Sequence, residues 1–241
     1  MITAENCRVD LGGFRLENIN LSIHDREIFA LIGETGAGKS ILLESLAGFH
    51  IPVSGSVKYD GREISSIPLP SRNIGFVYQD YGLFPHMKVR ENIEFGLKMH
   101  GMSRKERRIK SDSLMESLKI GHLSGRYPAT LSGGEQQRTA LARALALEPE
   151  VIFMDEPFSA LDPGTKEKMY SLIRNIHKEF GCTIIFVTHD FNEAAVLADR
   201  VGVMIKGQLR KVCSSCDLFD GNDDEDVAGF LNAKNKNKKL A

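Results

Sequence analysis

The sequence predicts an α/β protein built around a parallel β-sheet that helices cover. Four short apolar runs are continuous rather than alternating, which is typical of strands buried on both faces of such a sheet. Each run ends in polar residues, and the stretch between the second and the third has a helical pattern. The four runs are Ile28–Ile32, Ile74–Tyr78, Val151–Met154 and Thr183–Thr188.

The segments outside these runs predict a small antiparallel β subdomain. Residues 2–23 are expected to form short strands and hairpins. The stretch SVKYDGREI carries an Asp60-Gly61 turn, and VGVMIKGQLRKV predicts a closing hairpin that turns at Lys206-Gly207. The Asp-Gly dipeptide favours the positive φ angles of tight hairpin turns.

The pattern becomes helical between about residues 88 and 147. A capping box from Ser103 to Glu106 predicts the start of a strongly basic helix. The end of the chain differs in composition, because an acidic cluster, NDDED, is followed by the lysine-rich KNKNKK. We therefore expect one domain over residues 1–221, a helical subdomain inserted at about 88–147, and a flexible charged tail over 222–241.

Composition bounds the class of protein. The chain has 241 residues, of which 42% are hydrophobic, so it can bury a substantial core. Its net charge of −1 gives no basic field for nucleic acid, and we expect no nucleic-acid partner. No apolar run approaches the roughly 20 residues that span a bilayer. The four cysteines indicate a reduced cytoplasm, and the lone pair Cys213 and Cys216 is interpreted as incidental thiols, because a zinc site needs a second ligand pair.

The stretch GETGAGKS fits the phosphate-loop pattern G-x-x-x-x-G-K-[ST], with a predicted strand before it and a helix after it. Its backbone N–H groups and the helix N-terminus favour phosphate oxygens. Lys39 can reach the β and γ phosphates, and Ser40 can bind Mg²⁺. The predicted nucleotide-binding residues are Gly33, Glu34, Thr35, Gly36, Ala37, Gly38, Lys39 and Ser40.

Polar residues follow the other three runs. Asp155 and Glu156 end one strand side by side, while Gln79 and His189 each come after another. Ligands bind at the carboxyl edge of open parallel sheets, so these side chains are expected to converge with Gly33. Asp155 is then the candidate for Mg²⁺, and Glu156 is the candidate for polarising the attacking water.

A second glycine-containing stretch, LSGGEQQR, starts another predicted helix. Ser132 and Glu135 form a capping box, which alone would explain a helix start. A cap does not require Gly133 and Gly134, each of which costs about 1 kcal/mol of helix propensity relative to Ala. Glycine permits close approach to the helix N-terminus, so we expect a phosphate there. Because the first loop encloses its own phosphates, the second is expected to serve a nucleotide held by another copy in a head-to-tail pair.

These motifs, together with VIFMDEP, SALD and VTHD, resemble the nucleotide-binding subunits of ABC transporters over residues 2–221. The resemblance implies a P-loop NTPase (RecA-like) core and an ATPase that uses ATP and Mg²⁺. It implies that Ser40, Gln79 and Asp155 serve the metal, that Glu156 is the catalytic base, and that His189 contacts the γ-phosphate. It also implies that Ser132, Gly133 and Gly134 bind that phosphate across a homodimer, and that Asp162 couples the two sites.

The stretches VYQDYGLFPHMKVRENIEFGL and SALDPGTK are similar to importers, and LGGFRLENINLSI is similar to their molybdate, tungstate and sulfate group. The resemblance implies a peripheral subunit at the cytoplasmic face of the membrane, with permease subunits and, indirectly, a substrate-binding protein as partners. An exporter subunit, or a soluble ATPase acting on ribosomes or DNA, remains the alternative. Phe14 either stacks on adenine, as an N-terminal aromatic does in the family, or belongs to the core.

Overall fold

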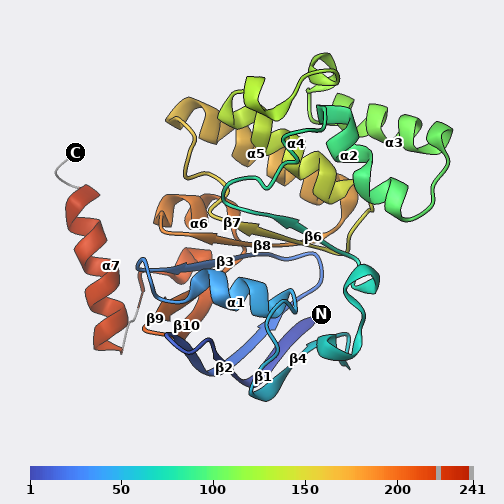
Figure 1. Cartoon of the computed structure of the whole chain (residues 1–241). Coiled ribbons are helices and arrows are strands. Elements are labelled where there is room, and N and C mark those ends of the chain that lie inside the picture. The colour runs from blue at the N-terminus through green and yellow to red at the C-terminus, as the bar shows by residue number, and fades with distance from the viewer. Residues whose placement is uncertain (221–223, 239–241) are drawn as a thin grey trace. The chain divides into compact units, whose positions relative to one another are not determined.

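A computed structural model describes residues 1–220 and 224–238, with side chains placed up to Leu231 (Figure 1). The chain folds into two compact units. The first unit comprises Met1–Arg72 and Thr183–Ala241, and the second comprises Asn73–Cys182. The second unit is therefore larger than the helical subdomain expected at about 88–147. It also includes a strand before that subdomain, and a strand and a helix after it.

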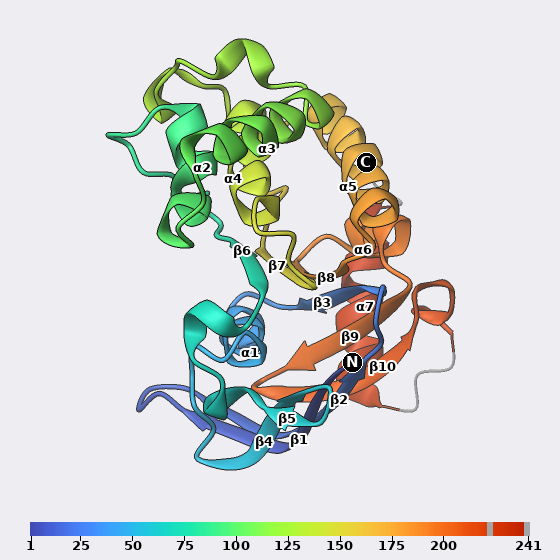
Figure 2. The same cartoon turned by 90° about the vertical axis from the view of Figure 1, so that its right-hand side faces the viewer.

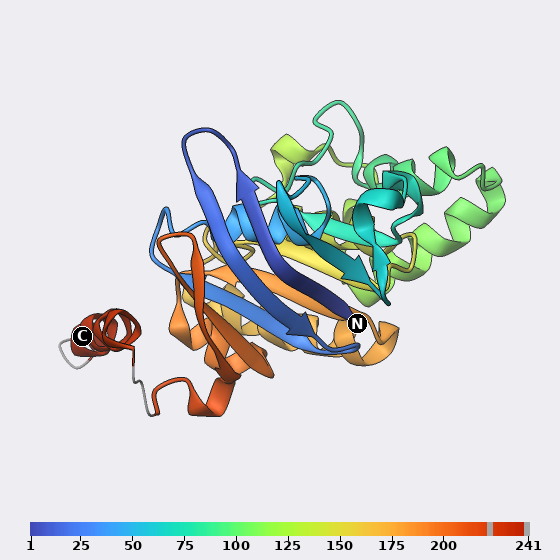
Figure 3. The same cartoon turned by 90° about the horizontal axis from the view of Figure 1, so that it is seen from below.

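An antiparallel sheet of the first unit has the strand order β2-β1-β4-β5. Strands β1 (Ile2–Asp10) and β2 (Arg15–Ile23) form a hairpin of nine-residue strands, longer than the short strands expected, and Figure 3 shows them side by side. Register shifts interrupt their pairing. Strands β4 (Ser54–Tyr59) and β5 (Arg62–Glu63) meet at the Asp60-Gly61 turn, where both residues have positive φ, as predicted.

The first unit also holds the strands β10-β9-β3-β8 in that order. Strand β3 (Ile28–Gly33) pairs in parallel with β8 (Thr183–Thr188) and β9 (Arg200–Ile205), and every residue of β3 and β8 is buried. Helix α1 (Lys39–Leu46) contacts β8, and α6 (Phe191–Leu197) contacts β3. Strand β10 (Gln208–Ser214) completes the hairpin at Lys206-Gly207. Continuous apolar runs thus did identify strands buried on both faces.

The second unit pairs β6 (Ile74–Val77) in parallel with β7 (Val151–Asp155). Its helices are α2 (Val89–Met99), α3 (Arg104–Ser117), α4 (Gly133–Leu145) and α5 (Pro163–Phe180), and Figure 2 shows α2, α3 and α4 grouped together. In β6 buried and half-buried residues alternate, so the expectation of a strand buried on both faces is wrong there. Both predicted capping boxes are confirmed.

Short 3₁₀ turns occur in both units. Over the described residues they are Ile64–Ser66, Leu69–Ser71, Gly121–Leu123, Pro128–Thr130 and Ser215–Asp217.

The C-terminal segment differs from the flexible tail expected over residues 222–241. Glu225–Lys238 forms α7, in which Val227, Phe230 and Leu231 are buried. The Phe230 ring lies 5.1 Å from that of Phe191, centroid to centroid. Charge alone suggested a loose terminus, but apolar residues three and four positions apart give the helix a packing face. Residues 222, 223 and 239–241 lie outside the described part of the chain.

No helix among the described residues has both the length and the apolar character needed to cross a bilayer.

Candidate functional site

The phosphate loop joins β3 to α1 in the first unit. A Cβ on Gly33 would lie 2.4 Å from the carbonyl oxygen of Met204, and a Cβ on Gly38 would lie 2.6 Å from Cε1 of Phe14. Gly36 and Gly38 have φ angles of 82° and 94°, in the left-handed region that favours glycine. No atom of the described residues lies within 4 Å of a Cβ placed on Gly36, so the loop is open there. Glycine is therefore required by packing at two positions and by conformation at a third.

Lys39 is the first residue of α1, and its side chain is buried. Its Nζ donates to the carbonyl oxygens of Gly33 (3.1 Å) and Glu34 (2.9 Å). The backbone of the loop thus surrounds the ammonium group of Lys39. Because Gly38 at the N-cap has no side chain, no side chain caps this helix N-terminus. A cationic side chain beside an uncapped helix start fits the binding of nucleotide phosphates.

Phe14 lies against this loop. Its ring is the nearest group to a Cβ built on Gly38, and its side chain is half-buried. The first unit therefore places Phe14 at the loop, where the resemblance places an adenine-stacking aromatic. The structure also shows that the ring of Phe14 packs against Gly38.

In the first unit His189 follows β8 at the edge where the phosphate loop follows β3, because Ile32 lies opposite Thr188 in the register. The turn after His189 is fixed by hydrogen bonds. The N–H of Asp190 donates to Oγ1 of Thr188 (3.0 Å), and Oδ1 of Asp190 accepts from the N–H of Asn192 (2.8 Å) to cap α6. The hydroxyl of Thr188 also bonds the carboxylate of Glu193.

In the second unit Gln79 and the acids Asp155 and Glu156 lie at one edge, since Val77 of β6 is opposite Met154 of β7. Glu156 has a φ of 41°. The N–H and Oγ of Ser159 donate to its carbonyl oxygen at 3.2 and 2.9 Å, which closes a tight turn. Because the backbone of Glu156 is in the left-handed conformation, the alternation of side chains along β7 ends directly after Asp155.

The stretch LSGGEQQR starts α4 as predicted. The N–H of Glu135 donates to Oγ of Ser132 (3.4 Å), and Oε2 of Glu135 accepts from the N–H (2.8 Å) and Oγ (2.9 Å) of Ser132. The hydrogen bond from the Ser132 backbone is the largest cause that lowers the pKa of Glu135. The carboxylate form is therefore the one that closes the capping box.

The two glycines of this turn have different surroundings. A Cβ on Gly134 would lie 3.0 Å from Cγ2 of Thr165, so this buried glycine lets the start of α4 pack on the start of α5. Packing inside the second unit thus gives one reason for glycine at Gly134, and the expected contact of its backbone with a phosphate stays a prediction. A Cβ on Gly133 would meet its nearest neighbours, outside its own helix, at 3.7 Å, and the residue is partly exposed, so a guest can approach Gly133 more easily.

Asp162 is the N-cap of α5. Its Oδ1 accepts from the N–H of Thr165 (3.0 Å), and hydrogen bonds from Thr165 lower the pKa of this carboxyl group. Asp162 thus has a structural contact in addition to the coupling role that the resemblance implies. Each unit brings one group of site residues together: residues 33–40 with His189 in the first, and Gln79, Asp155 and Glu156 at one edge of the second.

One residue that the sequence analysis missed is Arg143, on α4. Its Nη1 donates to the carbonyl oxygen of Gly82 (2.6 Å) and its Nη2 to that of Tyr81 (3.0 Å). The guanidinium carbon lies 5.4 Å from the ring centroid of Phe84, and burial lowers the pKa of the group. Arg143 therefore attaches the segment after Gln79 to α4. The sequence signal was an arginine inside the apolar run ALARALAL.

Replacing Arg143 with Met should lower the free energy of unfolding by about 2–4 kcal/mol. Two backbone carbonyls would lose their donor, and an unsatisfied buried group costs about 1–3 kcal/mol. Urea unfolding would measure the loss. Arg104→Met is the control, since Arg104 is exposed on α3, and an equal loss in both variants would contradict the assigned role.

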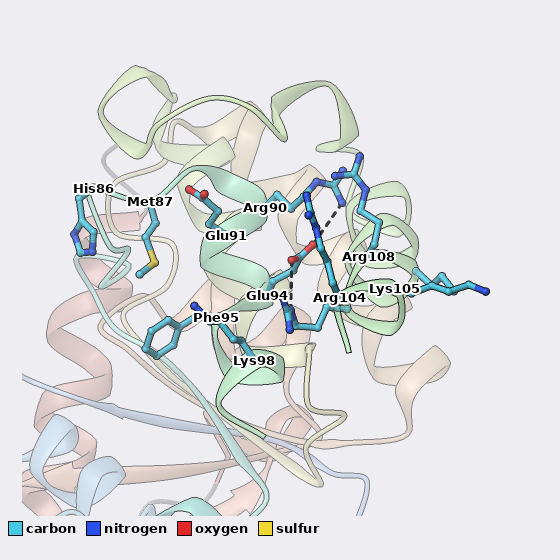
Figure 4. A pocket seen from close by; sticks show the side chains of 12 residues that line it. His86, Met87, Arg90, Glu91, Glu94, Phe95, Lys98, Arg104, Lys105 and Arg108 are labelled. Atoms are coloured by element: carbon cyan, nitrogen blue, oxygen red, sulfur yellow. Dashed lines mark ion pairs between the residues drawn. The ribbon is translucent and has the colours of Figure 1, made fainter. Parts of the chain in front are cut away.

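A groove of about 990 Å³ lies along α2 and α3 in the second unit (Figure 4). His86, Met87 and Phe95 line one part, and basic side chains outnumber acidic ones in the remainder. Arg90 pairs with Asp112 (2.7 Å), and Glu94 lies 3.8 Å from Arg90 and 3.7 Å from Arg107. The exposed basic side chains in the groove include Lys98, Arg104 and Lys105.

Over the residues that the structure describes, no group of three His, Cys, Asp or Glu side chains could hold a metal ion. Cys213 and Cys216 are free thiols. Mg²⁺ in nucleotide enzymes usually has one or two protein ligands plus phosphate oxygens and water, so an ion that arrives with a nucleotide needs no such cluster.

A family model described as "ABC transporter" matches residues 16–159, more than half of the chain. The chain is 45% identical over 235 residues to the molybdate/tungstate import ATP-binding protein of Pyrococcus horikoshii, which covers 98% of this chain and 68% of that protein. It is 41% identical over 239 residues to a sulfate/thiosulfate import ATP-binding protein of Rhizobium meliloti, covering 97% and 65%. It is 42% identical over 216 residues to the spermidine/putrescine import ATP-binding protein of Pseudomonas fluorescens, covering 90% and 60%.

Solved structures of ATP-binding cassettes are also similar to this chain. The chain is similar to the dimeric ATP-binding cassette MJ0796 bound to ADP and Pi in a post-hydrolysis state, with a TM-score of 0.80 and 31% identity over 89% of this chain and 99% of that one. It is also similar to cbiO1 of Clostridium perfringens, part of an ABC transporter complex, with a TM-score of 0.83 and 30% identity over 90% of each chain.

Proposed function

This chain belongs to the ABC transporter family and is an ATP-hydrolysing subunit, and we propose that it energises the import of a small oxyanion through a separate membrane permease. The observation that carries the proposal is the 45% identity to a molybdate/tungstate import subunit over 98% of the chain. The relative named for sulfate and thiosulfate supports the same class of cargo. The subunit would act at the cytoplasmic face of the membrane.

For the chemistry, we propose that the chain binds Mg–ATP through the motif residues predicted from the sequence. Residues 33–40 hold the phosphates, and His189 contacts the γ-phosphate. Asp155 and Gln79 serve Mg²⁺ together with Ser40, and Glu156 polarises the attacking water. The backbone geometry of the phosphate loop and the buried ammonium of Lys39 support this assignment.

We further propose that two copies pair head to tail, so that Ser132 and Gly133 of one copy meet the nucleotide of the other. The partly exposed, side-chain-free start of α4 at Gly133 supports this. The dimeric state of the solved MJ0796 cassette also supports it. Under this proposal Gly134 meets that nucleotide with its backbone as well, in addition to packing on α5.

The groove along α2 and α3 is proposed as the docking site of a cytoplasmic segment of the permease. The segment that follows Gln79 reaches the groove through His86 and Met87, so a guest there would touch the same stretch of chain as the nucleotide site. The excess of basic side chains favours an acidic permease segment. The apolar side chains of Met87 and Phe95 would receive its buried side.

The double substitution Arg104→Glu with Lys105→Glu should release the subunit from its permease, because two attractive charges become repulsive. The expected result is loss of copurification of a polytopic membrane protein at low salt, with ATP binding unchanged. Lys168→Glu, an exposed lysine of α5 outside the groove, is the control. Retention of the same membrane protein by the double variant would contradict docking in this groove.

Cargo is tested by uptake. Cells lacking this gene should lose accumulation of labelled tungstate, molybdate or sulfate, and the wild-type gene should restore it. Loss of spermidine uptake instead would favour the polyamine class, to which a 42% identical relative belongs by name. Recovery of the chain with ribosomes or DNA, and with no membrane protein, would favour the soluble-ATPase alternative, and a requirement for efflux would favour an exporter.

A further inference from the structure

Tyr81 lies two residues after Gln79, and its side chain is only 6% exposed. Its hydroxyl group is buried and has no hydrogen-bond partner among the described residues. That hydroxyl oxygen lies 3.7 Å from the position that a Cβ would occupy on Gly133. The phenol therefore extends from the Gln79 segment to the turn that starts α4. Burial also raises the pKa of Tyr81, so the hydroxyl keeps its proton.

The backbone of Tyr81 is held in an unfavourable conformation. Its φ is 65°, in the left-handed region where a bulky residue is uncommon. Arg143 donates to the carbonyl oxygens of Tyr81 and of the next residue, Gly82, and the N–H of Tyr81 donates to the carbonyl oxygen of Tyr78 (2.9 Å); these bonds hold the turn. A strained backbone and an unpartnered buried hydroxyl in one residue indicate that the surroundings impose this arrangement.

A second buried group without a partner lies one helical turn further along α4. Gln137 is 2% exposed, and its Oε1 has no hydrogen-bond partner in the described chain. Residues four apart lie on one face of a helix, so Gln137 follows Gly133 on the side where Tyr81 reaches α4. A phenol can donate and an amide oxygen can accept, so the two groups are chemically complementary.

A third segment meets the others at Gly133. The carbonyl oxygen of Ala160 and Cδ2 of Leu161 lie 3.7 and 3.9 Å from the same Cβ position. These residues directly precede Asp162. The start of α4 is therefore in contact with both the Gln79 segment and the turn that carries Asp162, all within the second unit.

We propose that Tyr81 is a positioning residue for the start of α4, and that its hydroxyl gains a hydrogen bond to Oε1 of Gln137 when ATP drives two copies together. The inference rests on the proposed head-to-tail pairing and adds a physical link to it. Movement of the Gln79 segment, which also lines the groove, would shift the turn that meets the partner's nucleotide. Tyr81 itself touches no reacting atom.

The test uses Tyr81→Phe in a Glu156→Gln chain, where bound ATP is expected to persist. Light scattering would measure the ATP-dependent pairing of two chains, fluorescent ATP would measure binding, and thermal unfolding would measure stability. The phenylalanine variant should pair about 25-fold more weakly, because one ordinary hydrogen bond, equivalent to about fivefold, is lost in each of the two copies. Its melting temperature without nucleotide should stay equal or rise, because a buried unpartnered hydroxyl has been removed. Its binding of ATP by the single chain should not change.

Weaker pairing together with an equal or higher melting temperature separates a positioning role from a packing role. The loss of a residue that serves only packing would lower the melting temperature. Tyr127→Phe, which removes an exposed hydroxyl in the same unit, is the control and should leave pairing unchanged. Gln137→Met should weaken pairing equally, and the double variant with Tyr81→Phe should be no weaker than either single one. Unchanged pairing of Tyr81→Phe, or independent effects of the two substitutions, would overturn this inference alone. Absence of pairing in the Glu156→Gln parent would instead overturn the proposed function.

Discussion

Replacing Glu156 with Gln is expected to lower the rate of ATP hydrolysis by about 10²- to 10⁴-fold, the usual contribution of a positioned general base. The amide keeps the size of the side chain but cannot accept a proton from the attacking water. ATP binding should persist, because the phosphate loop belongs to residues 33–40. Phosphate release measures the rate, and light scattering should show that paired chains accumulate when ATP is present.

The matched control is Glu150→Gln, an exposed carboxylate just before β7. It should hydrolyse ATP at the parent rate, because it lies at the opposite end of that strand from Asp155. If Glu156→Gln turns over ATP like the parent, Glu156 is not the base. Another carboxylate or a water-positioning residue would then have to take its place.

Replacing Ser132 with Arg is expected to abolish ATP-driven pairing and to lower hydrolysis by at least about 100-fold, while single chains still bind ATP. The bulky side chain would occupy the partly exposed start of α4, where Gly133 leaves open access. Analytical ultracentrifugation with ATP, together with fluorescent ATP binding, would measure both effects. Retained pairing would return the stretch to an ordinary helix cap.

Loss of a helix cap costs about 1 kcal/mol by itself, so the experiment needs a variant with the same loss elsewhere. Ser103→Arg provides it. Ser103 caps α3 with an equivalent capping box, in which the N–H of Glu106 donates to its Oγ at 3.3 Å. This control should lose similar stability and yet pair and hydrolyse normally.

Local signals were sufficient for most elements of the fold. Continuous apolar runs predicted β3, β7 and β8, the capping boxes predicted α3 and α4, and the positive φ at Asp60-Gly61 followed from residue type. Each of these features depends on neighbours within one turn or one strand. The strand β6 was predicted correctly in position but not in burial, because its surroundings are set by the sheet.

The structure added features that depend on distant contacts. No local pattern shows that Arg143 bonds the backbone of Tyr81, 62 residues earlier. The burial of Val227 and Phe230 in α7 was hidden by the charged residues around them. The two glycines after Ser132 look equivalent in sequence, and only their surroundings distinguish packing at Gly134 from access at Gly133. The catalytic assignments themselves rest on motif resemblance and stay predictions.

The close packing at Gly134 has a mechanical consequence. A Cβ on Gly134 would lie 3.0 Å from Cγ2 of Thr165, so any larger residue there would push the first turns of α4 and α5 apart. Ser132 lies at the tip of one helix and Asp162 at the tip of the other. Because the two helix starts pack directly on each other, we expect them to move together, and spectroscopic labels placed on the two helices should keep a fixed separation throughout the ATPase cycle.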